Sequence, residues 1–172
     1  NPSNHKIDGH CSKEETVAMA VRAQKMGMRI MINFHYSDSW ADPAKQNKPL
    51  AWANHTVAQL KQDVYYHTFE VLTALKTAGV TPEWVQVGNE IPGGMLWPEG
   101  STTNWSQLAQ FLNSGYDAVK AVNPKIKVVV HVDEGNNNGT QGLQTPGYNP
   151  YLQTASGPFS QIGQTLQQGW EA

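Results

Sequence analysis

Three times along this chain, a stretch with helical periodicity is followed by a glycine or proline and then by a short run rich in valine and isoleucine. The helical stretches cover residues 13–26, 56–78 and 104–123, and the strand-like runs cover residues 28–35, 84–87 and 126–133. Helices that alternate with such strands favour parallel pairing, with the crossover helices on the outside of the sheet. The sequence therefore predicts an α/β fold.

Capping residues and apolar stripes define the predicted helices. Ser12 and Glu15 have the spacing of a capping box, Gly27 suits the position just after the first helix, and Asn104 with Gln107 predicts a second box. Residues at helical spacing predict the buried faces of the second and third helices: Val57, Leu60, Val64, Phe69, Leu72 and Leu75, and Leu108, Phe111, Leu112, Tyr116 and Val119.

Each predicted strand ends in polar residues of reactive types. They are His35 and Asp38, Asn89 and Glu90, and His131 and Asp133. Such residues converge at the carboxyl ends of the strands in a (β/α)8 barrel, and a doubly wound sheet also places its ligand there. Side chains alternate along a strand, so the last two share a face that would point into a barrel. Three strands of eight would make this chain at most about half of a barrel.

Composition excludes several classes of ligand. The net charge is −2, only 15% of residues are charged, and the basic residues are scattered, which argues against nucleic acid and membrane partners. No apolar run reaches membrane-spanning length, and the first residues lack the pattern of a signal peptide. Cys11 is alone, and His5, His10, His55 and His67 show no ligand spacing, so we expect no metal and no cofactor. Six Trp and six Tyr suit neutral sugars.

The segment 85–98 carries the most specific chemistry. A β-branched run ends at Glu90, Gly88 and the glycines after Pro92 break regular pairing, and Trp97 follows closely. In sugar-cleaving enzymes an acid protonates the departing oxygen, an amide such as that of Asn89 holds a hydroxyl, and an aromatic face stacks on the ring. The alternative reading is a solvated glutamate at the start of a loop.

Two motifs resemble the endo-β-1,4-galactanases, a family of glycoside hydrolases with a (β/α)8 barrel. They are Asn33-Phe34-His35-Tyr36-Ser37-Asp38-Ser39-Trp40-Ala41-Asp42-Pro43 and Val87-Gly88-Asn89-Glu90-Ile91-Pro92-Gly93-Gly94-Met95-Leu96-Trp97-Pro98. The resemblance implies that Glu90 is the general acid/base, that Asn89 binds the sugar 2-hydroxyl, and that His35, Asp38, Trp40, Trp97, His131 and Asp133 line the galactan cleft. It also implies that the three strands are the third to the fifth of the barrel, and that the nucleophile lies on the seventh, outside this chain.

Several of these residues also have a simpler interpretation. His35 could be a neutral core imidazole, and Asp38 could form a local turn. Trp40 and Trp97 lie in predicted loops, which favours stacking on a ligand, whereas Trp84 and Trp105 begin a strand and a helix and are expected in the core.

The resemblance divides the chain and leaves its function open between three readings. We expect residues 1–138 to be part of a catalytic barrel and residues 139–172 to be an atypical tail rich in Gly, Gln and Pro. The first reading is retaining endo-hydrolysis of β-1,4-galactan or galacto-oligosaccharides, outside the cell or in the periplasm. The others are a non-catalytic carbohydrate-binding or truncated fragment, and a related barrel glycosidase on another β-linked polysaccharide. For a fragment, the expected partner is the missing remainder of the barrel. A fragment alone would expose strand edges, and such edges promote association.

Overall fold

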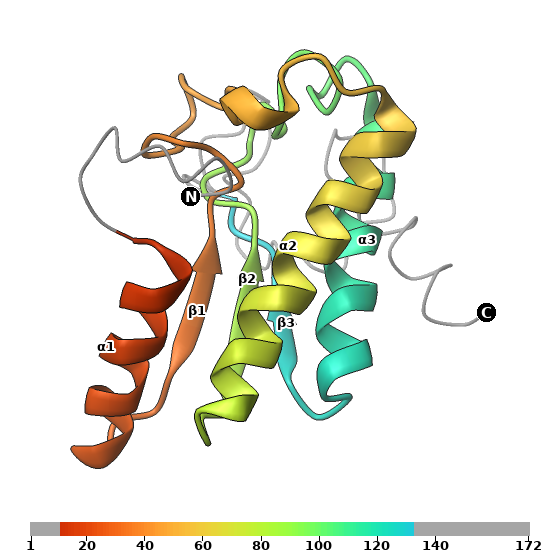
Figure 1. Ribbon diagram of the computed structural model, residues 1–172. Coiled ribbons are helices and arrows are strands. Elements are labelled where there is room, and N and C mark those ends of the chain that lie inside the picture. Colours follow the sequence, from red (N-terminus) through yellow and green to blue (C-terminus); the bar gives the residue numbers. More distant parts are fainter. Residues whose placement is uncertain (1–10, 133–172) are drawn as a thin grey trace, which may run out of the picture.

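The computed structural model describes residues 11–132, in which helices and strands alternate as predicted (Figure 1). The elements in chain order are α1 (Lys13–Lys25), β1 (Met31–Phe34), the short 3-10 helix η1 (Leu50–Trp52), α2 (Val57–Thr77), β2 (Trp84–Val87), α3 (Trp105–Val122) and β3 (Lys127–Val129). The strands form one parallel sheet in the order β1-β2-β3. Residues 139–172, the predicted tail, lie outside the described residues.

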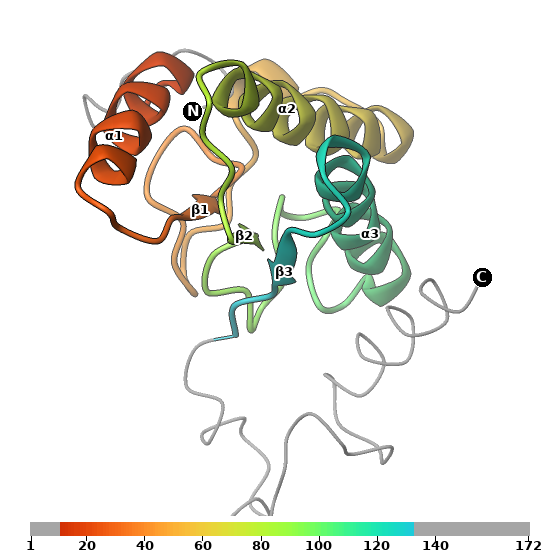
Figure 2. The same cartoon turned by 90° about the horizontal axis from the view of Figure 1, so that it is seen from below.

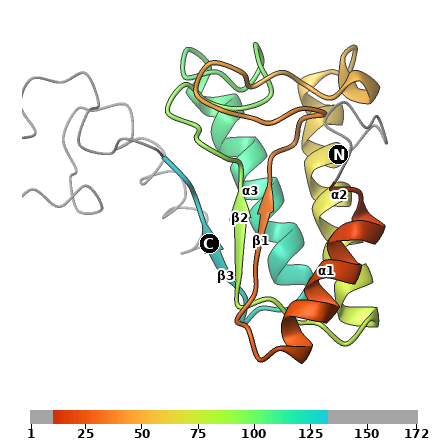
Figure 3. The same ribbon diagram turned by 90° about the vertical axis from the view of Figure 1, so that its left-hand side faces the viewer.

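All three helices lie on one side of the sheet (Figures 2 and 3). Ile32 and Phe34 of β1 and Val85 and Val87 of β2 are buried toward these helices. Because side chains alternate along a strand, Asn33 and its register partner Gln86 point to the opposite face. The helix-facing side of the sheet is therefore apolar, and the other side carries amides.

The core between the sheet and the helices contains most of the predicted apolar stripes. In α2, Leu60, Val64, Leu72 and Leu75 are buried as predicted, but Phe69 is 36% exposed and stacks on the ring of Tyr65. Thr68 and Val71 take the place predicted for Phe69. Thr68 can be fully buried because its hydroxyl donates to the Val64 carbonyl at 2.7 Å and lies 2.7 Å from the Tyr36 hydroxyl. A hydroxyl with both partners supplied costs little to bury.

The capping box predicted at Ser12 is present. The Ser12 hydroxyl accepts from the Glu15 amide at 3.2 Å, and the Glu15 carboxylate accepts from the Ser12 amide at 2.9 Å. After α1, Gly27 has a φ of 76°, the left-handed conformation expected of a residue that follows a helix. The Met28 amide then donates to the Ala23 carbonyl, which ties Met28 to the helix and delays the start of β1 to Met31.

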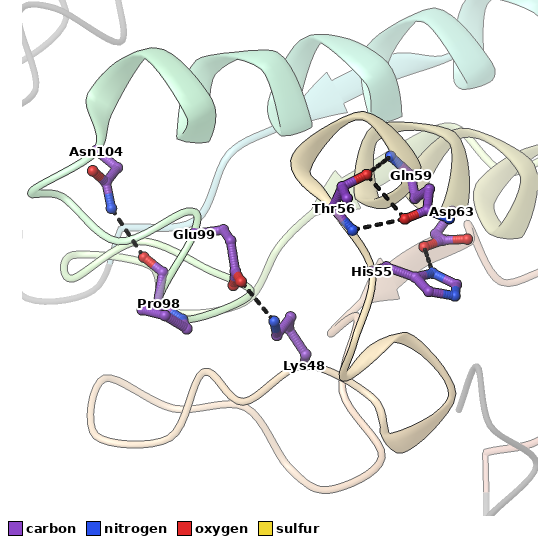
Figure 4. Close-up of polar contacts among 8 residues, drawn as sticks. All are labelled: Lys48, His55, Thr56, Gln59, Asp63, Pro98, Glu99 and Asn104. Carbon is purple, nitrogen blue, oxygen red and sulfur yellow. Dashed lines mark hydrogen bonds and ion pairs between the residues drawn. The ribbon is translucent and has the colours of Figure 1, made fainter.

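The second predicted capping box is wrong, and an unpredicted one occurs instead. Asn104 does precede α3, but its side-chain amide donates to the Pro98 carbonyl at 3.1 Å and caps nothing (Figure 4). The turn before α3 brings that carbonyl within reach of the Asn104 nitrogen, and in this orientation the Asn104 oxygen accepts no hydrogen bond from a helix amide. At α2, Thr56 and Gln59 form a reciprocal capping box that was not predicted (Figure 4).

Ion pairs connect the three strands near their amino-terminal ends. Arg29 makes two 2.6 Å hydrogen bonds to the Glu83 carboxylate, and Lys127 lies 3.3 Å from it. The same two cations lie 4.3 Å and 5.4 Å from the ring centroid of Trp84. The expectation that Trp84 lies in the core is wrong, because its ring is partly exposed and contacts these two cations, whereas Trp105 packs against the core as expected.

The charged cluster predicts a pH-dependent contribution to stability. Hydrogen bonds from Arg29, followed by those from Lys127, lower the pKa of Glu83 to about 2. A carboxyl whose pKa is depressed by folding stabilises the protein above its unfolded pKa of about 4.3, and this contribution disappears as the pH falls toward 2. We therefore expect the stability difference between wild type and Glu83→Gln to shrink over that range in urea unfolding. In Arg29→Gln, an NMR titration should find the Glu83 pKa nearer its ordinary value; an unchanged pKa would contradict the assignment.

Candidate active site

The polar residues predicted at the strand ends gather at one end of the sheet. The loop after β1 (residues 35–56, orange in Figure 1) and the loop after β2 (residues 88–104, green) lie together at the carboxyl ends of the strands, and His131 follows β3 at the same end. Asp133, predicted beside His131, lies outside the described residues.

Glu90 has an unusual backbone conformation. Its φ is 47°, in the left-handed region that residues with a side chain seldom adopt and that tends to occur at functional sites. The Glu90 carbonyl accepts from the Gln46 side chain at 3.0 Å, and the next amide, of Ile91, donates to the His131 carbonyl at 3.0 Å. Within residues 11–132 no group donates to the half-buried Glu90 carboxylate. A rigid backbone therefore presents a carboxylate that is available for a ligand.

Asn89, itself buried, lies at the centre of a network of amides. Its Oδ1 accepts from Asn33 at 2.9 Å and from Gln86 at 3.0 Å, and lies 3.2 Å from Nδ1 of His131. Its Nδ2 donates to the Ala41 carbonyl at 2.9 Å. Asn33, Gln86, Asn89 and His131 form what we call the inner network. It fixes the orientation of the amide next to Glu90.

Two members of the inner network, Asn33 and Gln86, were not among the predicted site residues. Each is an amide in the middle of an otherwise apolar strand, on the face away from the helices. Gln86 is buried and its amide therefore needs polar partners, which was the available signal, whereas Asn33 is exposed. The predicted inward direction of His131 agrees with the structure, because its ring lies 3.5 Å from Gln86 on that same face.

His35 is held as a neutral ring against an exposed tryptophan. The Ala41 amide donates to Nδ1 of His35 at 3.1 Å, and the ring centroid of Trp40 lies 4.7 Å away in an edge-on arrangement. Burial lowers the pKa of His35 below its ordinary value, and the neighbouring His131 acts in the same direction. Trp40 is 65% exposed, so a large part of its indole surface is open to a ligand.

The side chains of Asp38 and Trp97 make hydrogen bonds to the backbone of the loops in which they lie. The Asp38 carboxylate, 9% exposed, accepts from the Leu50 amide at 2.8 Å and so fixes the start of η1, a longer-range contact than the local turn we considered. The indole of Trp97 donates to the Gly93 carbonyl at 2.9 Å within its own loop. Trp97 is half-buried, so it offers less surface for stacking than Trp40.

A partly buried ion pair joins the two loops. Nζ of Lys48 lies 2.7 Å from Oε1 of Glu99, and these side chains are only 12% and 25% exposed (Figure 4). The second oxygen of Glu99 is buried without a partner among the described residues. The Lys48 ammonium is therefore the main compensation for a carboxylate that water reaches poorly.

For this ion pair we expect the single variant Lys48→Met to lose more stability than the double variant that also replaces Glu99. Lys48→Met leaves the Glu99 charge uncompensated, and we expect it to lower the free energy of unfolding by about 2 kcal/mol, less than for a fully buried pair because both groups are partly exposed. Adding Glu99→Gln removes the stranded charge and should recover about half of that loss. Urea unfolding of the four proteins in the cycle measures both values; simple additivity would contradict a direct interaction.

The described part of the chain holds no group of three His, Cys, Asp or Glu residues arranged to bind a metal ion. None of the helices within residues 11–132 has the length and apolar character needed to cross a membrane.

Comparison with known proteins gives one consistent result. The model of glycosyl hydrolase family 53 matches residues 1–151. An arabinogalactan endo-beta-1,4-galactanase from Thermothelomyces thermophilus is 40% identical over 136 residues, which cover 78% of this chain and 41% of that protein. A GH53 catalytic domain from Ignisphaera aggregans superposes with a TM-score of 0.69 at 44% identity, over 71% of this chain and 34% of its own. A solved structure of fungal beta-1,4-galactanases gives 0.72 at 40% identity, over 76% and 40%.

These matches confirm the predicted fold class, in which the chain forms a part of a (β/α)8 barrel. The chain spans about two fifths of the length of the curated relatives it matches.

Proposed function

Because this chain belongs to glycosyl hydrolase family 53, we propose that the protein of which it is a part hydrolyses β-1,4-galactosidic bonds within (arabino)galactan. The observation that carries the proposal is Glu90: a carboxylate without a protein partner among residues 11–132, on a backbone held from both sides, at the end of a barrel strand. Galactanases among its relatives suggest the substrate.

In the proposed mechanism Glu90 is the general acid/base. As the glycosidic bond breaks, its carboxyl proton passes to the departing oxygen, and a second carboxylate attacks the anomeric carbon to form a covalent intermediate with retention of configuration. Glu90 then takes a proton from the water that releases the sugar. We place the nucleophile on a part of the protein outside residues 1–172, about 5 Å from Glu90 in the closed barrel.

The other predicted residues would bind the sugar. We propose that Asn89 donates its free Nδ2 hydrogen to the 2-hydroxyl, because its Oδ1 is occupied by the inner network. Trp40 would stack on a pyranose ring, with His35 positioning the indole edge-on. Asp38, Trp97, His131 and Asp133 would complete the cleft wall, the first two mainly by fixing its loops. The catalytic domain would include residues 1–138, in a protein that meets its polymer outside the cell or in the periplasm.

The test is the activity of the full-length protein on three polymers. We expect reducing ends to appear at least tenfold faster from β-1,4-galactan than from cellulose or mannan, with a rapid fall in chain length and β-anomers as first products. A preference for either other polymer would favour the related-glycosidase reading. Reducing sugar released by residues 1–172 alone would contradict the proposal that the nucleophile lies elsewhere, and binding without hydrolysis by the full-length protein would favour the non-catalytic reading.

A further inference from the structure

We propose that Gln46, in the loop after β1, is a positioning residue that holds the backbone of Glu90 in its catalytic conformation. This inference rests on the proposed role of Glu90 as the acid/base. It assigns the geometry of that acid to a side chain 44 residues away in sequence, on a neighbouring loop.

The Gln46 side chain is buried and its amide is used as a donor to three backbone carbonyls. Gln46 is 2% exposed, and its Nε2 lies 2.8 Å from the carbonyl oxygen of Asn89, 3.0 Å from that of Glu90 and 3.0 Å from that of Asp42. Three acceptors around one side-chain atom require that atom to be the nitrogen. Its two hydrogens are shared among the three carbonyls. Two of those carbonyls belong to Asn89 and Glu90, the adjacent candidate site residues.

The two successive carbonyls can meet one donor only because the backbone turns at Glu90. In an extended strand, successive peptide groups point in opposite directions. The φ of 47° at Glu90 ends that alternation and directs both carbonyls toward Gln46. For a residue with a side chain the left-handed conformation costs about 1–2 kcal/mol. The Gln46 hydrogen bonds offset this cost.

The same peptide is held from its other side, and Gln46 is itself fixed. The Ile91 amide donates to the His131 carbonyl at 3.0 Å, so both polar atoms of the peptide between Glu90 and Ile91 are bound. The Gln46 carbonyl accepts from the Trp97 amide at 2.8 Å. Without the Gln46 amide this peptide keeps one of its two anchors and can rotate. A shift of about 1 Å in a catalytic group can cost on the order of 100-fold in rate.

The leaving group of the substrate separates a positioning role from a purely structural one. A sugar leaving group needs its oxygen protonated, whereas dinitrophenolate leaves with little help from an acid. We expect Gln46→Met in the full-length protein to lower kcat/KM for galactan by about 10- to 100-fold. The value for a dinitrophenyl β-1,4-galactobioside should stay within about threefold, because kcat/KM reports the step in which that group leaves.

A matched control removes a buried hydrogen bond elsewhere. Thr68→Val takes away the partner of the Tyr36 hydroxyl in the core and has nearly the same volume as the original side chain. It should lower the melting temperature while leaving kcat/KM for both substrates within threefold of wild type. If Gln46→Met does not fold, Gln46→Glu carries the test, because a protonated carboxyl can donate one hydrogen bond to these carbonyls. Its galactan rate relative to its aryl rate should recover as the pH falls from 7 to 5.

Two results would overturn the inference. Equal losses on both substrates would indicate a general structural effect, and unchanged kinetics on galactan would show that the amide is not needed. Glu90→Gln, measured in the same assays, separates this failure from that of the proposed function. If Glu90→Gln hydrolyses galactan normally, the proposed function fails; if it loses galactan activity selectively and Gln46→Met does not, only the role of Gln46 fails.

Discussion

Replacing Glu90 by glutamine in the full-length protein is expected to lower kcat for galactan by about two to four powers of ten. Glutamine has the same shape but no proton to give to the departing oxygen. The Glu90 backbone is held through the Gln46 side chain and the His131 carbonyl, which are unchanged in the variant, so the fold and the direction of the side chain should be preserved.

The control for this experiment lies at the other end of the same strand. Glu83 precedes β2 and is bound to Arg29, far from the loops that carry Glu90. Glu83→Gln makes the same chemical change and should leave kcat within twofold of wild type. The initial rates of reducing-end formation on galactan measure both variants. A Glu90→Gln variant within tenfold of wild type would rule out the assignment of Glu90 as acid.

Among the variants proposed here, Gly94→Ala is expected to lower the free energy of unfolding most, by about 3 kcal/mol or more, from backbone strain and overpacking together. Gly94 has a φ of 93°, and a Cβ added there would lie 2.1 Å from the carbonyl oxygen of Gly100 and 2.7 Å from Cα of Ser101. Both of these atoms are backbone, so neither can move aside as a flexible side chain would. The loop that follows Glu90 would have to open.

Gly79→Ala measures the cost of the positive φ alone, without a close contact to the added Cβ. Gly79 also has a positive φ, 78°, but nothing lies within 4 Å of the position its Cβ would take. It should lose only about 1 kcal/mol. Urea unfolding of the two variants compares the losses directly, and equal losses would show that the contact between residues 94 and 100 does not limit this loop.

The predictions that succeeded depend on neighbours along the chain. Helix periodicity, the Ser12 capping box and the glycine after α1 are local patterns, and they were sufficient for the order of helices and parallel strands. The predicted strands were too long at both β1 and β3. The first is shortened because the α1 terminus captures Met28, and the third because β2 turns away at Gly88, whose φ is 81°.

The predictions that failed depend on hydrogen-bond partners that lie outside the local sequence pattern. Phe69 has the apolar character of a core residue, but Thr68 occupies the buried position because Tyr36, from another element, supplies its hydrogen bond. Asn104 has the spacing of a cap, but the Pro98 carbonyl lies within its reach.

The candidate site shows the same division. The position of Glu90 at a strand end followed from the apolar run and the glycines around it, and the structure places it there. The roles of its residues remain predictions for the experiments above. Gln46 lies in a loop without periodicity, and no local pattern indicated that its amide would reach Asn89 and Glu90.

The inner network has a consequence for how this sequence can evolve. Gln86 donates to Asn33, and both donate to the Oδ1 of Asn89, so each of the three amides depends on the other two. An apolar substitution at any one of them removes at least one hydrogen bond from a buried amide that remains, Gln86 or Asn89, and each such bond is worth about 0.5–1.5 kcal/mol. A second substitution in the network then costs less than it would alone. Mutations at these positions should therefore show strong epistasis, and the three residues should be exchanged together or retained together.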